Sequence, residues 1–256
     1  MHLLFARFLA RFLYQEHIVP SPEPFNHLIT QGMVLGETYI NKATGAYEHP
    51  ENVEKKNGQW IDKKTGDEVE VKFLKMSKSK HNGIDPVDVI NQYGSDVVRV
   101  GMLMQCPPAN PFLYSKSIMN PAMNILNSAE RVCKVCIDQC NQEGGKLNLV
   151  EISKANNKVI HDMNAFNFHN VIANINIMLN HLERASFCPP YLQYTKNVLL
   201  FLSPFAPIKT EKLWTGLIEA NCINKEDTFD KQVWPKEIKV NSVMAIIQVR
   251  LMIKND

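Results

Sequence analysis

The apolar residues of the C-terminal half recur at helical spacing, and this periodicity constrains the fold more than any other feature. One stripe advances in steps of three, four, three and four residues, through Phe168, Val171, Ile175, Met178 and Leu182. Such a stripe lies on one face of an α-helix and is typical of helices packed in a bundle. Two further stripes are Tyr194, Val198, Leu199 and Leu202, then Leu213, Trp214 and Leu217. We therefore predict helices from about Met119 onward.

The first 38 residues predict a helix, a loop and a strand. Residues 2–14 place their apolar side chains on one helical stripe, and three prolines between positions 20 and 24 mark a loop. The apolar run Leu28–Leu35 is predicted as a short buried strand. Gly32 lies where two backbones are expected to pass closely.

The hydrophilic segment 39–74 is predicted to form a small β insertion. Val69, Val71 and Phe73 alternate with charged residues, which is the period of a half-buried strand. Residues 59–62 are its expected hairpin partner.

Two short helices are predicted after residue 84. Asp85 is suited to the N-cap of the first, Pro86 to its first turn, and Gly94 to its end. Ser95 is expected to cap the second helix, which stops at the prolines of segment 105–111. The apolar face of the first helix is expected to consist of Val87, Val89 and Ile90.

Between the β insertion and these helices lies a basic, polar loop. Lys75, Lys78 and Lys80 supply three ammonium groups within six residues, and Ser77 and Ser79 add hydroxyl groups. A lysine ammonium is a point charge on a long stem that suits contact with phosphate oxygens. Most short runs of this kind are solvated surface charges. The order of the residues therefore has to decide between a phosphate-binding loop and an ordinary charged surface.

That order resembles a known family. Residues 75–79 match letter for letter the KMSKS loop of class I aminoacyl-tRNA synthetases, and the flanking segments resemble the leucyl-tRNA synthetases of bacteria and mitochondria. The supporting segments are His2–Phe8, Phe12–Tyr14, Glu23–Phe25, Gln31–Tyr39, Met76–Asp85, Phe168–His169 with Ala173, Leu202–Pro207 and Leu213–Trp214. Isoleucyl-, valyl- and methionyl-tRNA synthetases are alternatives within the class.

The resemblance implies a fold of two classes, α/β followed by all-α. Residues 1–118 would be the C-terminal part of a Rossmann-like catalytic domain, with the β insertion at 39–74. Residues 119–235 would be a helical tRNA-binding bundle of the anticodon-binding type. Residues 236–256 would be the remnant of a C-terminal β domain, with a strand at Val243–Val249.

The resemblance also implies the chemistry of the site. Lys78 and then Lys75 would be the catalytic residues that contact the phosphates of ATP, with Mg²⁺ expected beside the nucleotide. Met76, Ser77 and Ser79 belong to the same ATP-binding loop. The backbone of Met33 and Val34 would lie near adenine, and His2 would lie near the leucine pocket or simply at a frayed helix end.

The family pattern is incomplete in this sequence. The His-Ile-Gly-His signature, the editing domain and most of the amino-acid pocket have no counterpart in these 256 residues. We therefore expect a fragment that does not form leucyl-adenylate alone. The alternatives are a non-catalytic tRNA-binding module and an inactive truncated product.

The composition says little about which molecules the protein binds. The net charge of +2 is too small to predict nucleic-acid binding by itself. The expected partners, tRNA-Leu, leucine and ATP, come from the resemblance, as does an expected monomer. No apolar run is long enough for a membrane span.

The cellular compartment of the protein is also inferred from the family resemblance. The resemblance favours the mitochondrial matrix, with the cytoplasm as the alternative. Residues 1–14 contain Arg7 and Arg11 and no acidic residue, so they also suit a mitochondrial presequence. An internal catalytic-domain helix is the favoured interpretation of this segment.

The cysteines do not suggest a disulfide framework in a chain of this length. Cys133, Cys136 and Cys140 could form part of a zinc site, but their spacing also places them on one helical face. No second ligand pair stands at zinc-finger spacing. Buried thiols are the favoured interpretation, and no metal site is predicted.

Overall fold

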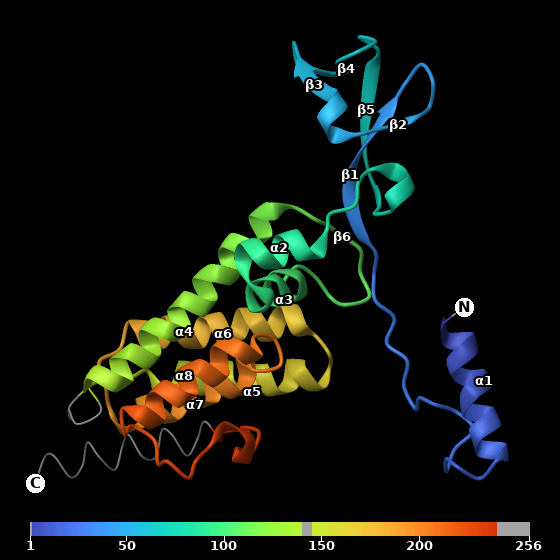
Figure 1. Ribbon diagram of the computed structural model, residues 1–256. Helices are drawn as coiled ribbons and strands as arrows, with labels where there is room; N and C mark the ends of the chain where they lie inside the picture. The colour runs from blue at the N-terminus through green and yellow to red at the C-terminus, as the bar shows by residue number, and fades with distance from the viewer. Residues whose placement is uncertain (1, 140–144, 240–256) are drawn as a thin grey trace, which may run out of the picture. The chain divides into compact units, whose positions relative to one another are not determined.

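The computed structural model describes residues 2–139 and 145–239, and the chain divides into two units, residues 1–31 and 32–256. Figure 1 shows the elements along the chain. They are α1 (His2–Gln15), β1 (Val34–Asn41), β2 (Tyr47–Glu48), η1 (Pro50–Asn52), β3 (Val53–Lys56), β4 (Gln59–Asp62), β5 (Glu68–Lys75), η2 (Lys78–Lys80), α2 (Pro86–Tyr93), α3 (Ser95–Leu103), β6 (Phe112–Leu113), η3 (Lys116–Ile118), α4 (Met119–Gln139), α5 (Leu149–Asn164), α6 (Phe168–Glu183), α7 (Pro189–Leu202), α8 (Pro207–Glu219) and η4 (Phe229–Lys231).

The first unit consists of helix α1 and the loop that follows it, which confirms the helix predicted at 2–14. Arg7 and Arg11 both bond to Glu23, with N–O distances of 2.8 and 2.9 Å, so the loop folds back along the helix. The hydrogen bonds from the two guanidinium groups lower the pKa of Glu23 to about 2. This contact therefore holds at neutral pH and weakens as the pH falls below the ordinary carboxyl range.

The strand predicted at Leu28–Leu35 is wrong in its position. Strand β1 begins at Val34, and Leu28 is 59% exposed. Pairing begins at Val34 and Leu35 because these residues are the first to face β6 and β5, respectively. The expected close approach at Gly32 is confirmed, because a Cβ there would lie 2.0 Å from the carbonyl oxygen of Asn110.

The β-strands form one mixed sheet with the order β2-β1-β5-β4-β3, and β6 pairs in parallel with β1. Strands β1 and β5 make a long antiparallel ladder from Leu35 opposite Lys75 to Asn41 opposite Val69. The predicted hairpin is confirmed, with Trp60 opposite Val69. A small core of Tyr39, Val53 and Val69 holds the sheet together.

Helices α2 and α3 follow the predicted boundaries, with two corrections. Asp85 caps α2 as expected, because its carboxylate accepts a hydrogen bond of 2.8 Å from the backbone of Val87. The cap position of α3 is Gly94 rather than Ser95, because the chain reverses there at a φ of +84°. The predicted apolar face of α2 is only partly correct, since Val89 is buried but Val87 and Ile90 are exposed.

Helices α4 to α8 pack side by side around the main core, as Figure 1 shows. The predicted stripes are confirmed: Val171, Ile175, Met178 and Leu182 are buried, as are Tyr194, Val198, Leu199, Leu202, Trp214 and Leu217, while Phe168 and Leu213 pack at the core's edge. None of the described helices combines the length and apolar character needed to cross a membrane.

The cysteines of α4 lie in the bundle core. Cys133 and Cys136 are buried, as the thiol interpretation expects, and burial raises the pKa of Cys133. Cys140 and the predicted strand Val243–Val249 lie outside the described residues.

Two charged side chains of α3 fasten it to the turn between α7 and α8. Asp96 is 8% exposed, and its carboxylate accepts a 2.6 Å hydrogen bond from the backbone of Lys209 in the first turn of α8. Arg99 donates to the carbonyl oxygens of Pro204 and Phe205 at 2.6 and 3.0 Å. Asp96 thus caps helix α8, whose first turn lies more than a hundred residues after Asp96 in the sequence.

This cap gives a stability prediction. Asp96→Ala should lower the free energy of unfolding by about 1–2 kcal/mol, because it leaves the Lys209 amide without its acceptor. Asp96→Asn keeps an acceptor oxygen and should lose less. Urea unfolding measures both variants, and equal losses for the two would contradict the capping role.

Candidate functional site

The basic loop continues directly from the last residue of β5. Met76 is held against β1, because its backbone N–H donates to the carbonyl oxygen of Val34 at 3.1 Å. The chain then makes the single turn η2 and reverses at His81, whose φ is +53°. The loop is therefore anchored at its start by the sheet and leaves its turn exposed.

The two lysines predicted to contact phosphate are exposed, and neither forms an ion pair with another described residue. Within the described part of the chain, no carboxylate lies within 4.0 Å of the ammonium group of Lys75 or Lys78. The hydroxyl groups of Ser77 and Ser79 lie 3.3 Å apart and can orient one another. Two uncompensated ammonium groups on one loop can bind an anion without first breaking an ion pair.

Asn82 holds the loop in this shape, a role that the sequence did not reveal. Its side chain is buried at 6% exposure, and its carbonyl oxygen accepts a 2.8 Å hydrogen bond from the backbone of Ser77. Its amide group lies within hydrogen-bond distance of the hydroxyl of Thr38 and of the carbonyl oxygen of Leu74, at 2.8 and 3.2 Å. Asn82 therefore ties the loop to both β1 and β5.

Gly36 makes this arrangement possible from the side of β1. A Cβ at this position would lie 2.6 Å from the carbonyl oxygen of Asn82 and 3.1 Å from the side chain of Met76. Even the smallest side chain would therefore push the loop away from the sheet.

The other predicted site residues are placed differently. Met33 and Val34 lie at the start of β1, where their carbonyl oxygens accept hydrogen bonds from Phe112 and Met76. The structure thus brings Val34 and the start of the basic loop together, and Met33 is 49% exposed beside them. His2 belongs to the first unit, so its role near leucine stays a prediction.

The short strand β2 also touches the turn η2. The imidazole rings of His49 and His81 stack with their centroids 4.4 Å apart and their planes 32° apart. The β insertion therefore contacts the tip of the loop that it precedes in sequence.

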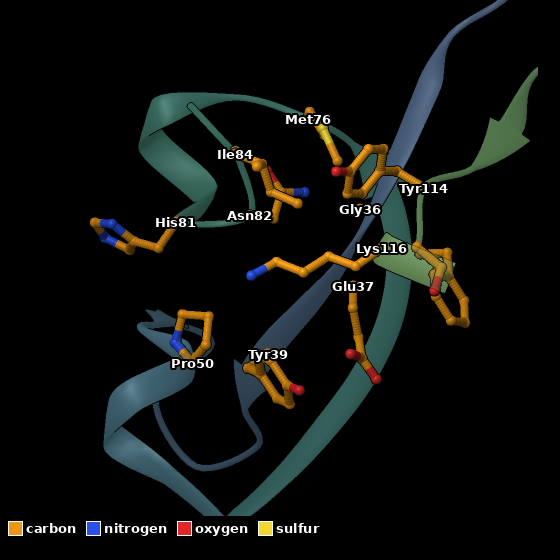
Figure 2. A pocket seen from close by; sticks show the side chains of 13 residues that line it. Gly36, Glu37, Tyr39, Pro50, Met76, His81, Asn82, Ile84, Tyr114 and Lys116 are labelled. Atoms are coloured by element: carbon orange, nitrogen blue, oxygen red, sulfur yellow. The ribbon is translucent and has the colours of Figure 1, made fainter. Parts of the chain in front are cut away.

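A pocket of about 450 Å³ opens between these parts, and Figure 2 shows its lining. It is lined by Gly36, Glu37, Tyr39, Pro50, Phe73, Met76, His81, Asn82, Gly83, Ile84, Tyr114, Ser115 and Lys116. The side chain of Lys116 extends across it with the ammonium group toward its middle. Burial, and then the nearby Glu37 carboxylate, raise the pKa of Tyr39 to about 12.

Lys116 is a second residue that sequence analysis missed. It stands well beyond the basic loop in the sequence and belongs to no recognisable motif. Only the pairing of β6 with β1 brings its segment beside the loop, so no local pattern could have pointed to it.

Protein-family comparisons agree with this arrangement. Residues 70–110, which include the basic loop, match the family described as "tRNA synthetases class I (I, L, M and V)". Residues 146–256 match the family described as "Anticodon-binding domain of tRNA ligase".

Curated relatives match almost the whole chain. A leucine–tRNA ligase of Prochlorococcus marinus is 31% identical over 97% of this chain, and one of Thermosynechococcus vestitus is 32% identical over 97%. The chain spans about 30% of the length of each of these relatives. These organisms are cyanobacteria, so the matches give no support to a mitochondrial location.

A solved structure confirms the predicted fold class. The ternary LeuRS–tRNA–LeuAMS complex of Agrobacterium radiobacter K84 matches with a TM-score of 0.60 and 23% identity, over 93% of this chain and 27% of the other. The likeness is one of fold: part of a class I synthetase catalytic domain, with its sheet, followed by a helical bundle.

Proposed function

Because this chain belongs to the leucine–tRNA ligase family of class I tRNA synthetases, we propose that it supplies the triphosphate-binding loop and the tRNA-binding bundle for ATP-dependent attachment of leucine to tRNA-Leu. The observation that carries this proposal is the pair of exposed lysines, Lys75 and Lys78, on a loop that Asn82 fixes to the sheet.

The proposed chemistry is electrostatic. When leucine attacks the α-phosphate of ATP, negative charge develops on the departing pyrophosphate. Lys78 and Lys75 would neutralise that charge, with Ser77 and Ser79 orienting the loop that carries them. Both ammonium groups carry their positive charge before the reaction starts. The site therefore needs little reorganisation as the bond between the α- and β-phosphates breaks.

The remaining site residues complete this proposal. The backbone of Met33 and Val34 would face adenine, and His2 would face the leucine side chain. The described residues contain no group of three or more histidine, cysteine or acidic side chains able to hold a metal ion. From the family resemblance, we expect Mg²⁺ beside the nucleotide, where phosphate oxygens are among its preferred ligands.

Competition between phosphate ligands tests this function. The chain should bind Mg²⁺-ATP saturably, and pyrophosphate should displace it, because the loop contacts the β- and γ-phosphates. AMP lacks these two phosphates and should compete poorly. Isothermal titration gives the three affinities, and equal affinity for AMP and ATP would contradict the assignment of the loop.

A second candidate function is tRNA binding without catalysis. The match of residues 146–256 to an anticodon-binding family favours it, since that region could act alone. In this case the chain binds tRNA with an affinity that falls steeply with salt, but it shows no saturable ATP binding. Filter binding of tRNA-Leu between roughly 50 and 200 mM salt, alongside the ATP titration, separates the two functions.

The amino acid and the compartment are also proposals. The names of the relatives favour leucine over isoleucine, valine and methionine. Comparing tRNA-Leu with tRNA-Ile in the same binding assay tests this choice. For the compartment, we propose the mitochondrial matrix, with the cytoplasm as the alternative, and imaging of the expressed chain tests this choice. We also propose that the chain is a monomer, which sedimentation of the expressed chain tests.

A further inference from the structure

A further pocket lies among helices α2, α3, α4 and α8, and no residue of the basic loop lines it. Its volume is about 320 Å³, which is within the range of small-molecule sites. Its wall includes Asp96, whose Oδ2 accepts the hydrogen bond from the backbone of Lys209. Asp96 is a buried acid in the wall of a cavity, so the surroundings of its second oxygen decide what the cavity can bind.

The second oxygen of this carboxylate, Oδ1, has no hydrogen-bond partner within the part of the chain that the structure describes. Asp96 is only 8% exposed, and leaving a charged acceptor unpaired in a buried place is unfavourable. The described residues contain no group of three or more histidine, cysteine or acidic side chains for a metal ion. An organic ammonium group fits Oδ1 instead, because it donates a hydrogen bond and also compensates the negative charge.

The same pocket also presents a cation, Lys212 of α8. Its side chain is exposed, and no carboxylate of a described residue, that of Asp96 included, lies within 4.0 Å of its ammonium group. The other lysine of the pocket, Lys209, is paired with Glu130 at 2.5 Å. Lys212 can therefore bind an anionic group without first breaking an ion pair.

Apolar side chains at the rim complete the pocket. Met123 of α4 is 36% exposed and Ile208 of α8 is 67% exposed, and both line the cavity. A ligand that covers them removes apolar surface from water, which is favourable. The ligand that suits the whole wall therefore carries an ammonium group, a carboxylate and an apolar side chain.

We propose that this pocket binds a free α-amino acid with an apolar side chain, with its ammonium group on Asp96 and its carboxylate on Lys212. The inference goes beyond the proposed function and does not depend on it, because neither residue belongs to the basic loop. A bound amino acid adds a partner to the carboxylate that caps α8, so it stabilises the fold as its concentration rises. The N-terminus of a peptide carries the same ammonium group, so the test has to separate the two sources.

Three ligands that differ only in their charged groups test the proposal. L-phenylalanine carries both charges, L-phenylalaninamide lacks the carboxylate, and N-acetyl-L-phenylalanine lacks the ammonium group. L-phenylalanine should bind about three- to fivefold more tightly than the amide, because Lys212 is exposed and its ion pair is weak. It should bind about 10-fold more tightly than the N-acetyl compound, because Asp96 is buried.

The probe and the readout are chosen to report on this pocket alone. Phenylalanine is used because leucine could also bind near His2 under the proposed function. The backbone amide of Lys209 donates to Asp96 at 2.6 Å, so its NMR chemical shift follows occupancy of the pocket. Titration of each ligand against this signal gives the three affinities.

Two variants should each abolish one preference. Lys212→Ala should bind L-phenylalanine and its amide equally, with the affinity for the amide changed by less than about twofold. Asp96→Asn should lose the preference over the N-acetyl compound, because its oxygen can stay on the Lys209 amide while its NH₂ group replaces the unpaired oxygen. Lys134→Ala, which removes an exposed lysine of α4 outside the pocket, should keep both preferences. Partial unfolding lowers all three affinities together and abolishes neither preference.

Each outcome has a definite meaning. Loss of each preference in its own variant supports the proposal. The absence of saturable L-phenylalanine binding, or a preference that survives in its own variant, overturns it. Binding of the amide that is as tight as that of L-phenylalanine and depends on Asp96 overturns the free amino acid in favour of a peptide N-terminus. The ATP titration of the unaltered chain bears on the proposed function alone.

Discussion

Asn82→Leu should release the basic loop from the sheet while leaving the helical bundle folded. Leucine has nearly the shape of asparagine but its side chain cannot hydrogen-bond, so the Ser77 N–H and the Leu74 carbonyl oxygen lose their partner at a partly buried position. Each such loss costs about 1–3 kcal/mol, so the local opening free energy should fall by about 2–4 kcal/mol. Hydrogen exchange of the Ser77 amide should then accelerate about 30- to 1,000-fold.

Two further variants make this prediction specific to the hydrogen bonds. Asn82→Asp keeps an acceptor for the Ser77 amide and should preserve part of its protection. Asn91→Ala, at an exposed position of α2, should leave the exchange of the loop unchanged. Slow exchange of the Ser77 amide in Asn82→Leu would show that other contacts hold the loop.

The helical half of the fold could be predicted because its information is local. Burying one face of a helix imposes a 3.6-residue period, and the stripe from Val171 to Leu182 carries that period without help from distant residues. The hairpin of β4 and β5 was predictable for the same reason, since alternation and turn residues lie within one short segment.

The error in the position of strand β1 arises because its partner strands lie elsewhere in the chain, whereas the error at the start of α3 is local. The run Leu28–Leu35 is apolar enough for a strand, but only the positions of β5 and β6 decide that pairing starts at Val34. Ser95 is a good capping residue, yet the positive φ of Gly94 shifts the start of α3 by one position.

The candidate site was predictable only in part. The lysines could be found because their order matches a known loop, and the structure leaves both exposed, Lys75 at the end of β5 and Lys78 in the turn η2. Asn82 acts through Thr38, which is 44 residues away, and Lys116 reaches the site through the pairing of β6. Neither position has a periodic or compositional signal, so these two roles required the tertiary structure.

Neutralising the loop lysines should have the largest effect on ligand binding. Each charge-assisted contact with a phosphate is worth about 1.5–3 kcal/mol, so Lys75→Ala/Lys78→Ala should weaken Mg²⁺-ATP binding by about 100-fold or more. The affinity for AMP should change by less than about threefold, because AMP lacks the β- and γ-phosphates that we propose the loop contacts. Both side chains are exposed, so their removal should leave the fold intact.

A matched control is available on the neighbouring strand. Lys72 of β5 is exposed and pairs with Glu70 at 2.8 Å, an ion pair of small energetic value. Comparing Lys72→Ala with the single Lys78→Ala variant shows whether the effect depends on position or on net charge alone.

The most direct measurement is the ratio of ATP to AMP affinity in the unaltered chain and in Lys75→Ala/Lys78→Ala, determined in one buffer by titration calorimetry. We predict that the unaltered chain prefers ATP and that the double variant loses this preference. A ratio that stays the same after both ammonium groups are removed would contradict the assignment of this loop to the triphosphate.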